Sequence, residues 1–493
     1  MESNQPGPGI PFAAPRNRVN VILAVLLPSM AAGMGWGIRG QYGHETGAMI
    51  AGALASLTLV LLFAPHFSSL AGARAAALMT VAIGIGGSMT YGQTVGLTQD
   101  TPLVGHWEAL RWGMLGLTIK GGIWIGFGGV FLGMGLSGKT YRVWEMVGVM
   151  AGLMGLYYFG TWLINTPFDP ANKILPYIYF SDSWYFEPDP NLKPRREVWG
   201  GMLAALVGLI AYTRIVRKDQ LALRIGIAGF LAGGLGFPGG QAVQSYHAWN
   251  SAAFAASSWN SYFGFFNWWN MMETTFGLIW GAVLGLGVWW NQKWIPAESP
   301  PDNVTLKPPM EVALCLIHLV VLLTSDFAKF VPDGQYLAIY TQLGILMTAL
   351  PVVAIVGGRF WPFLMVLPIA AAPVVSKSLK LFTYDWKRYS PDIGWFLVVL
   401  LPMVILFFAV TYLIEESYRK QSTRRFASIS LLLATWTYFG LNTVFFEFAW
   451  PWRPWTGRTP NQIIFTACAA GLTIYATVSL CMQRKTEPRN GET

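Results

Sequence analysis

Charged residues are scarce in this chain of 493 residues: only 12% are Asp, Glu, Lys or Arg, whereas 54% are hydrophobic. A soluble protein usually contains about a quarter charged residues, so the composition excludes an ordinary soluble enzyme. It also excludes a disordered chain, which has too few apolar residues to fold, and a coiled coil, which needs charged flanking positions. We therefore expect an all-α, polytopic membrane protein.

Cysteine is nearly absent. The three cysteines, Cys315, Cys468 and Cys481, lie in apolar segments and form no closely spaced pair. This pattern excludes a disulfide framework and a zinc-finger spacing. The net charge of +9 does not indicate nucleic acid, because the basic residues lie in short loops between apolar segments, where membrane orientation explains them. We therefore expect membrane lipids, and no nucleic acid, as partners.

Long apolar segments recur along the whole chain. A helix of about 20 residues crosses a bilayer core of roughly 30 Å. By this measure the sequence predicts about fourteen transmembrane helices, near residues 19–38, 44–63, 74–96, 112–136, 143–165, 198–216, 222–244, 268–291, 310–330, 337–357, 360–377, 394–414, 427–449 and 460–482.

The distribution of basic residues predicts the orientation. With the N-terminus inside, cytoplasmic segments hold nineteen of the 33 Lys and Arg residues, and thirteen lie on the outer side. Because cytoplasmic loops are enriched in Lys and Arg, we expect both termini in the cytoplasm and the chain in the plasma (inner) membrane. Lys120 lies within a span, and the outer residues Arg39 and Arg111 fit a site better than a loop.

The spans divide the chain into regions. Arg16 and Arg18 before an apolar run could also belong to a signal peptide, but an uncleaved first helix is favoured because the residues after it belong to a repeated pattern. The expected regions are a disordered cytoplasmic tail (1–18), a transmembrane region of about eight helices with the site (19–291), a cytoplasmic linker (292–309), a second transmembrane region of about six helices (310–483) and a cytoplasmic tail (484–493).

A local pattern repeats on the predicted outer side. The pair Gly-Gln occurs at residues 40–41, 92–93 and 240–241, and Glu-Thr follows the first and third copies at 45–46 and 273–274. This predicts parallel internal repeats, with chance repetition of a common dipeptide as the alternative. Gly35-x-Gly37-x-x-Gly40 matches a dinucleotide fingerprint, but no βαβ unit surrounds it. We expect these glycines to break helices near the membrane surface.

Ionisable residues in apolar segments are costly and usually mark function. Gln41, His44 and Glu45 share one helical face if a helix has begun there, and Arg39 can reach Glu45 through a turn. A structural ion pair that caps the second span is the alternative. Lys120 is expected to pair with Glu45, Glu108 or Glu273, or to extend to the interface. The full set of candidate substrate-binding residues is Arg39, Gln41, His44, Glu45, Gln93, His106, Glu108, Arg111, Lys120, Gln241, His247, Glu273 and Glu447.

No cofactor or metal ion is expected. His44 and Glu45 are adjacent and point about 100° apart on a helix, and no H-E-x-x-H or comparable motif occurs. Glu187 and Asp189 fit a solvated, Pro-rich surface loop better than an ion site. The aromatic segment 246–270 is expected to be interfacial or re-entrant, with stacking on a sugar ring as the alternative.

Two functions remain open from the sequence. The first is a secondary permease for a polar small molecule, sugar-like or anionic, with a polar cavity toward the outer face. The second is a membrane-embedded transferase or hydrolase acting at the outer face on a lipid-linked or carbohydrate substrate. In that case Glu45 or Glu273 would be the general base, His44 its proton partner and Arg39 the ligand of an anionic group. Span number favours the permease.

Overall fold

The computed structural model describes residues 19–40, 42, 47–86, 89, 91–172, 174–181, 186, 194–327, 349–419, 421–445 and 454–486. Their regular secondary structure is helical. The helices are α1 (Val21–Arg39), α2 (Ala48–Phe63), α3 (Ser69–Ile85), α4 (Gly92–Gln99), α5 (Trp107–Leu136), α6 (Val143–Ile164), α7 (Trp199–Ala211), α8 (Gln220–Trp249), α9 (Ser251–Ala256), α10 (Asn260–Phe263), α11 (Trp268–Asn291), α12 (Pro308–Phe327), α14 (Trp361–Leu364), α15 (Ala370–Leu379), α16 (Pro391–Gly394), α17 (Leu401–Tyr418), α18 (Thr423–Phe445) and α19 (Thr459–Thr486). Four π-helical segments, Tyr212–Val216, Met365–Ile369, Lys380–Asp385 and Trp395–Leu400, continue or join them.

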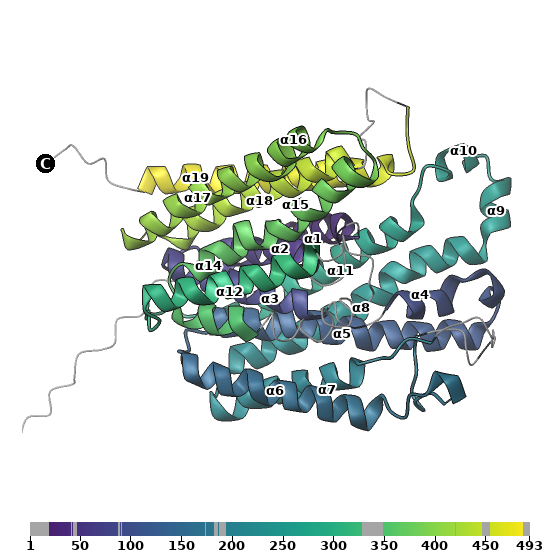
Figure 1. Cartoon of the computed structure of the whole chain (residues 1–493), viewed down its shortest axis with the longest axis horizontal. Helices are drawn as coiled ribbons and strands as arrows, with labels where there is room; N and C mark the ends of the chain where they lie inside the picture. Colours follow the sequence, from purple (N-terminus) through teal and green to yellow (C-terminus); the bar gives the residue numbers. More distant parts are fainter. Residues whose placement is uncertain are drawn as a thin grey trace, which may run out of the picture.

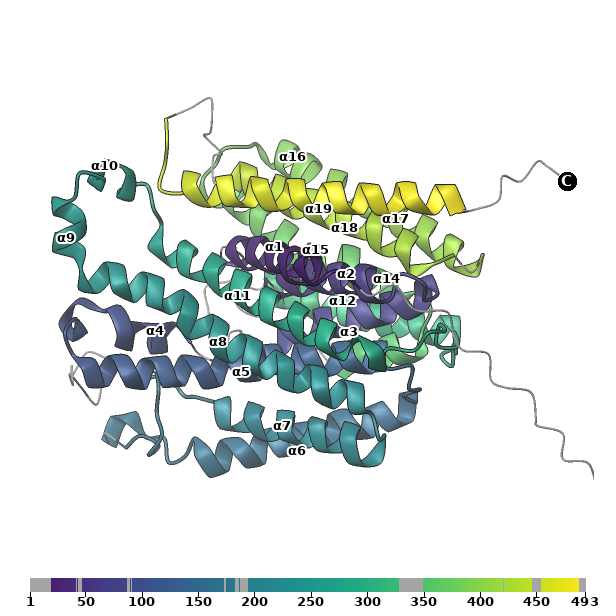
Figure 2. The ribbon, with the colours of Figure 1, turned by 180° about the vertical axis from the view of Figure 1, so that it is seen from behind.

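The long helices lie side by side with similar axis directions (Figures 1 and 2). α6 and α7 form one edge of the bundle, followed by α5 and α8, then by the central helices α1, α2, α3 and α11. α17, α18 and α19 form the opposite edge, and α18 packs on α2 while α19 packs on α1. The short helices α9 and α10 project at one end of the bundle, at the right in Figure 1.

The surface of the bundle is that of a membrane protein. Within the described ranges, nine helices are long and apolar enough to cross a bilayer, and three shorter apolar helices accompany them. The edge helices α6 and α17 expose large apolar side chains: Trp162 is 64% exposed and Phe408 is 74% exposed. Apolar faces of this extent need lipid rather than water around them. The chain is therefore a helical, multi-pass membrane protein.

The fourteen predicted spans are not confirmed, and two of their boundaries are wrong. The span predicted at 74–96 is interrupted: α3 ends at Ile85 and α4 begins only at Gly92. Conversely, the glycine-rich segment 236–241 does not end a span, because α8 continues through Pro238 to Trp249. Most of the span predicted at 337–357 lies outside the described residues.

The three Gly-Gln pairs occupy different places in the fold, so the predicted repeat is not confirmed. Gly40 follows the end of α1, and Gly92 and Gln93 begin α4, but Gly240 and Gln241 lie inside α8. Each pair therefore has its own local structure rather than a shared one.

Close packing of α1 and α11 depends on a glycine stripe. Gly277, Gly281 and Gly285 lie on one face of α11, and a Cβ atom at any of them would overlap a backbone carbonyl oxygen of α1, at Ala32, Pro28 and Ala24 respectively. Small residues of this spacing let two helix backbones approach closely, which is the main source of helix association in lipid. The stripe fixes α11, and with it Glu273, against the end of α1.

Replacement of Gly281 by alanine is expected to lower the free energy of unfolding by about 1–3 kcal/mol, because the added methyl group forces α1 and α11 apart. Gly152 in α6 is the matched control: a Cβ atom there has no neighbour within 4 Å. Gly152→Ala should be neutral or stabilising, since alanine is the better helix former by about 1 kcal/mol. Unfolding curves of both variants in the same detergent check this, and equal destabilisation would contradict the role of the stripe.

The aromatic segment 246–270 forms the end of α8, the helices α9 and α10 and the start of α11. Its rings pack on one another: His247 stacks on Trp268 with 4.2 Å between ring centroids, and Phe254 contacts both. Trp259 and Tyr262 stay more than half exposed. Exposed Trp and Tyr at one end of a helical bundle are typical of the membrane–water interface.

Candidate functional site

The end of α1 and the break between α3 and α4 meet in the interior of the bundle. α1 ends at Arg39 and α2 begins at Ala48, while α3 ends at Ile85 and α4 begins at Gly92, with Tyr91 as its N-cap residue. Glu273 lies in the second turn of α11, opposite Gly40, where a side chain in place of the glycine hydrogen would overlap the Glu273 carboxylate. α1 thus ends next to Gly40, as predicted, but it continues through Gly35 and Gly37, so the breaks predicted at these two glycines are wrong. The end of α1 places Arg39 against α11.

Arg39, Tyr91 and Glu273 form a buried ion-pair cluster. The Arg39 Nη1 atom lies 2.9 Å from Glu273 Oε1 and donates a hydrogen bond of 2.8 Å to the Tyr91 hydroxyl, which in turn lies 3.3 Å from Glu273 Oε1. All three residues are at most 3% exposed. Separating two such charges inside a bundle is strongly unfavourable, so each is stable there only with the other.

Aromatic rings surround the guanidinium group. The Arg39 Cζ atom lies 5.0 Å from the ring centroid of Trp36, 5.3 Å from that of Tyr91 and 5.5 Å from that of Trp124. Trp36 also contacts Phe276 edge to face, with 4.5 Å between ring centroids. Cation–π attraction reaches about 2 kcal/mol where water is excluded, so the rings help to hold the positive charge in this place.

The cluster lies near the mid-length of the two longest helices. Trp124, beside the Arg39 guanidinium, is about 18 Å along α5 from its end at Leu136 and about 26 Å from its beginning at Trp107, at 1.5 Å per residue. Phe237 of α8 contacts Tyr91 and lies about 18 Å from the end of that helix at Trp249. Irregular backbone at this depth is tolerated only where protein or a wet cavity surrounds it.

Buried amide side chains extend the cluster. The Asn270 side chain donates to the Gly37 carbonyl oxygen at 2.7 Å, and the Asn461 side chain donates to the Thr274 hydroxyl at 3.2 Å. Gln241 donates to the Thr98 hydroxyl at 2.8 Å. Within the described structure, the side-chain oxygens of these three amides and Oε2 of Glu273 are buried without a hydrogen-bond partner. The region therefore keeps unused hydrogen-bonding capacity.

Arg458, just before α19, adds a second cation near Glu273. Burial lowers the pKa of the Arg458 guanidinium, and the nearby Glu273 carboxylate raises it. Four residues of this region were not predicted as site residues from the sequence: Tyr91, Asn270, Arg458 and Asn461. No sequence signal connects Arg458 or Asn461 with the cluster, because they lie just before and at the start of the last helix, 185 and 188 residues after Glu273.

Lys120 belongs to a separate buried pair. Its Nζ atom lies 2.6 Å from Glu197 Oε1 and donates to the hydroxyls of Thr94 at 2.8 Å and Ser181 at 3.2 Å. The predicted pairing with Glu108 or Glu273 is wrong: Glu108 is exposed at the first turn of α5, and Glu273 pairs with Arg39. Glu197 has further donors in the Phe180 N–H at 3.0 Å and the Trp199 indole at 3.2 Å.

Of the other candidates, the structure separates His106, Arg111 and His247 from the cluster, places Gln93 two residues after Tyr91, and does not describe the rest. His106 caps α5 by accepting from the Ala109 N–H at 3.2 Å, and Arg111 is exposed on the same helix. His247 lies in the aromatic segment at the end of α8, and Gln93 lies in the first turn of α4. Gln41, His44, Glu45 and Glu447 lie outside the described residues.

Among the residues that the structure describes, no group of three or more His, Cys, Asp or Glu side chains could hold a metal ion. The acidic and basic groups of the cluster instead neutralise each other, Arg39 with Glu273. The site is therefore an aromatic-lined ion pair with amide groups around it. No protein-family model matches the chain, and no curated protein or solved structure is significantly similar to it.

Proposed function

We propose that the chain is a secondary permease for a polar small molecule, sugar-like or anionic, and that the Arg39–Tyr91–Glu273 cluster is its substrate site. One observation carries the proposal: the end of α1 and the break between α3 and α4 bring a fully buried ion pair beside the mid-length of the two longest helices, α5 and α8. Transporters typically bind their substrates near the bilayer midplane, between helices whose backbone is broken there.

The chemistry of the cluster fits such a substrate. The planar guanidinium group of Arg39 binds carboxylate or phosphate oxygens in a two-pronged manner, and an anionic substrate would take the place of Glu273 on it. The rings of Trp36 and Trp124 would pack on the apolar face of the substrate, while Gln241 and Asn270 would bind its hydroxyl groups. Lys120 has a structural role in this scheme, because Glu197 already neutralises it.

α4 is the outer gate in this proposal. It runs from Tyr91 in the cluster toward the end of the bundle with α9 and α10, and it consists of only eight residues. Side-chain contacts hold it in place, from Lys120 to Thr94 and from Gln241 to Thr98. A short segment held by a few polar contacts can move without the long helices around it unfolding. In the proposed orientation, both termini lie in the cytoplasm and α4 faces outward.

Two-sided accessibility tests this proposal without knowledge of the substrate. Single cysteines at Gln93, Gln241 and Thr274, in a background without the three native cysteines, are labelled with an impermeant thiol reagent from either face of sealed vesicles. Alternating access predicts that at least one of them reacts from both sides. Cysteines at Trp107 and Lys139, which are exposed near opposite ends of α5, should react from one side each and serve as controls.

Labelling of all three positions from the α9–α10 side alone would contradict a permease. It would favour the membrane-embedded transferase or hydrolase, whose pocket opens only outward. Protection of the cysteines by a candidate sugar or carboxylate would then identify the substrate class under either function.

A further inference from the structure

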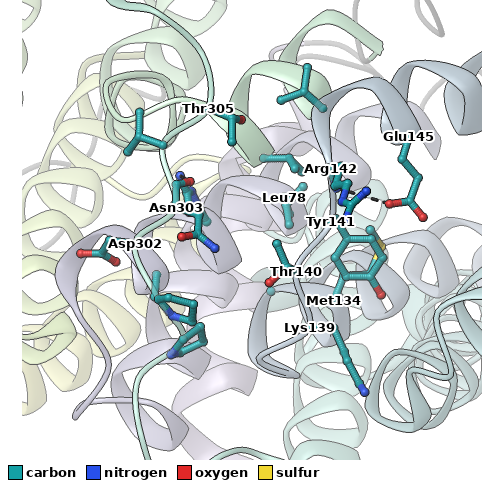
Figure 3. A pocket seen from close by; sticks show the side chains of 18 of the residues that line it. Leu78, Met134, Lys139, Thr140, Tyr141, Arg142, Glu145, Asp302, Asn303 and Thr305 are labelled. Atoms are coloured by element: carbon teal, nitrogen blue, oxygen red, sulfur yellow. Dashed lines mark hydrogen bonds between the residues drawn. The ribbon is translucent and has the colours of Figure 1, made fainter.

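A cavity of about 1280 Å³ lies at the end of the bundle opposite to α9 and α10, where α5 ends and α6 begins. α3, the turn between α5 and α6, and the segment 300–306 line it. Figure 3 shows Asp302 and Asn303 on one side, with Tyr141, Arg142 and Glu145 on the other. The cavity is separate from the Arg39 cluster, since Trp124 lies about 18 Å along α5 from Leu136.

The charges that line the cavity are mainly positive. Four cationic side chains, Arg74, Lys139, Arg142 and Arg217, stand against two anionic ones, Glu145 and Asp302. The two acids already have partners, because Glu145 lies 3.4 Å from Arg217 and accepts from the Tyr212 hydroxyl at 2.6 Å, while Asp302 accepts from the Ser68 hydroxyl. The lining thus has an excess of two positive charges.

Two of the four cations remain available for a ligand. Arg74 donates to the carbonyl oxygens of Asn303 at 2.7 Å and Gly358 at 2.9 Å, so it is held by backbone. Lys139 and Arg142 are exposed, and neither side chain forms a salt bridge within the part of the chain that the structure describes. Because no group in the described lining neutralises these two positive charges, the cavity favours the binding of an anion.

The remaining lining combines polar side chains, such as Thr140 and Asn303, with an apolar wall. Leu78, Met134, Leu306 and Val356 contribute to the inner wall, and Trp144 at the start of α6 is 76% exposed beside Arg142. An exposed tryptophan next to cations at a helix end is typical of the level of the lipid headgroups. The volume also exceeds that of most sites for small soluble ligands, about 300–1,000 Å³.

We infer that this cavity binds the phosphate group of an anionic phospholipid, with Lys139 and Arg142 as its ligands and the apolar wall beside the upper part of the acyl chains. Basic pockets between transmembrane helices at the cytoplasmic surface recognise anionic headgroups by this combination of charge and apolar surface. The site goes beyond the proposed transport function: it lies at the other end of the bundle and requires no substrate.

Native mass spectrometry of the full chain in detergent tests the inference. Dioleoylphosphatidylglycerol and dioleoylphosphatidylcholine are titrated separately, and glycerol 3-phosphate is added as a soluble competitor. The wild type should retain the glycerol lipid and not the choline lipid. Lys139→Gln with Arg142→Gln should weaken its binding by about 25-fold, at about fivefold for each cation. Lys293→Gln, which removes an exposed charge outside the cavity at the same end, should leave binding unchanged.

Equal retention of the two lipids would overturn the inference, because it means that binding does not depend on the net charge of the headgroup. An equal loss of binding in Lys293→Gln would also overturn it, because it means general attraction to a basic surface. Displacement of the lipid by stoichiometric glycerol 3-phosphate would support the phosphate site and assign it to soluble phosphate esters. If the double variant unfolds, Arg142→Gln alone decides, with an expected loss of about fivefold.

Discussion

Replacement of Arg39 by methionine is expected to lower the free energy of unfolding by about 3–5 kcal/mol, because it leaves the Glu273 carboxylate buried without its counter-charge. Methionine retains most of the apolar contact with Trp36 and Trp124, so the loss of charge dominates the effect. Glu273→Gln should destabilise by a comparable amount, since it isolates the guanidinium group instead. Unfolding monitored by tryptophan fluorescence in detergent measures both.

A double-mutant cycle separates structure from function at this pair. Arg39→Met combined with Glu273→Gln removes both charges and should recover most of the lost stability, as buried pairs replaced by neutral groups often do. The exposed pair of Arg419 and Glu415, 3.0 Å apart, is the control: Glu415→Gln, which removes only this exposed contact, should lower the free energy of unfolding by at most about 0.5 kcal/mol. If the double variant is stable but substrate no longer protects the site cysteines from the thiol reagent, the pair has a role in substrate binding. If substrate still protects these cysteines, the pair contributes only to the stability of the fold.

The helical membrane fold could be predicted from the sequence because its cause is local. Apolar segments of about 20 residues with few charges have no other stable state in a bilayer than a helix. The break between α3 and α4 was not predicted because residues 86–91 carry no charge, and a long apolar window does not record where one helix ends and the next begins. The opposite error occurred at Pro238: its glycine-rich surroundings predicted the end of a span, but α8 continues through this proline.

The partners of the buried charges could not be predicted because they are distant in sequence. The sequence places Arg39 within reach of Glu45, the nearest acid along the chain, whereas the structure pairs it with Glu273, 234 residues away. The sequence did identify Arg39 and Glu273 as separate candidates, since each is an ionisable residue in an apolar segment. Only tertiary packing, through the glycine stripe of α11, brings the two together.

Glu197 was missed because its surroundings in the sequence are polar. It follows Arg195 and Arg196 at the end of a loop of about thirty residues, and such a loop is expected to be solvated. In the structure it is fully buried beside Lys120, and the two arginines before it remain exposed. A lysine deep in an apolar span indicates that a buried acid exists, but it does not indicate which one.

Replacement of Glu197 by alanine is expected to have an effect as large as that of Arg39→Met, about 3–5 kcal/mol, because it isolates the buried Lys120 ammonium group. It also removes the acceptor of the Phe180 N–H and of the Trp199 indole. Lys120→Met should lower the free energy of unfolding by less, because these donors and the Ser181 hydroxyl still form hydrogen bonds with the Glu197 carboxylate. Unfolding in detergent should rank the two variants in this order.

Trypsin provides a local measurement of the same pair. In the wild type the bond after Arg196 is protected, because the next residue is held in the bundle by Lys120, and cleavage requires that contact to open. Glu197→Ala should therefore speed cleavage at Arg195 and Arg196 by at least about tenfold under native conditions, which corresponds to about 1.4 kcal/mol of local opening. Cleavage at Arg388, which is exposed just after the π-helical segment Lys380–Asp385 and has no contact with this pair, should not change. Equal acceleration at both places would mean that the variant unfolds globally and that the pair does not hold this loop locally.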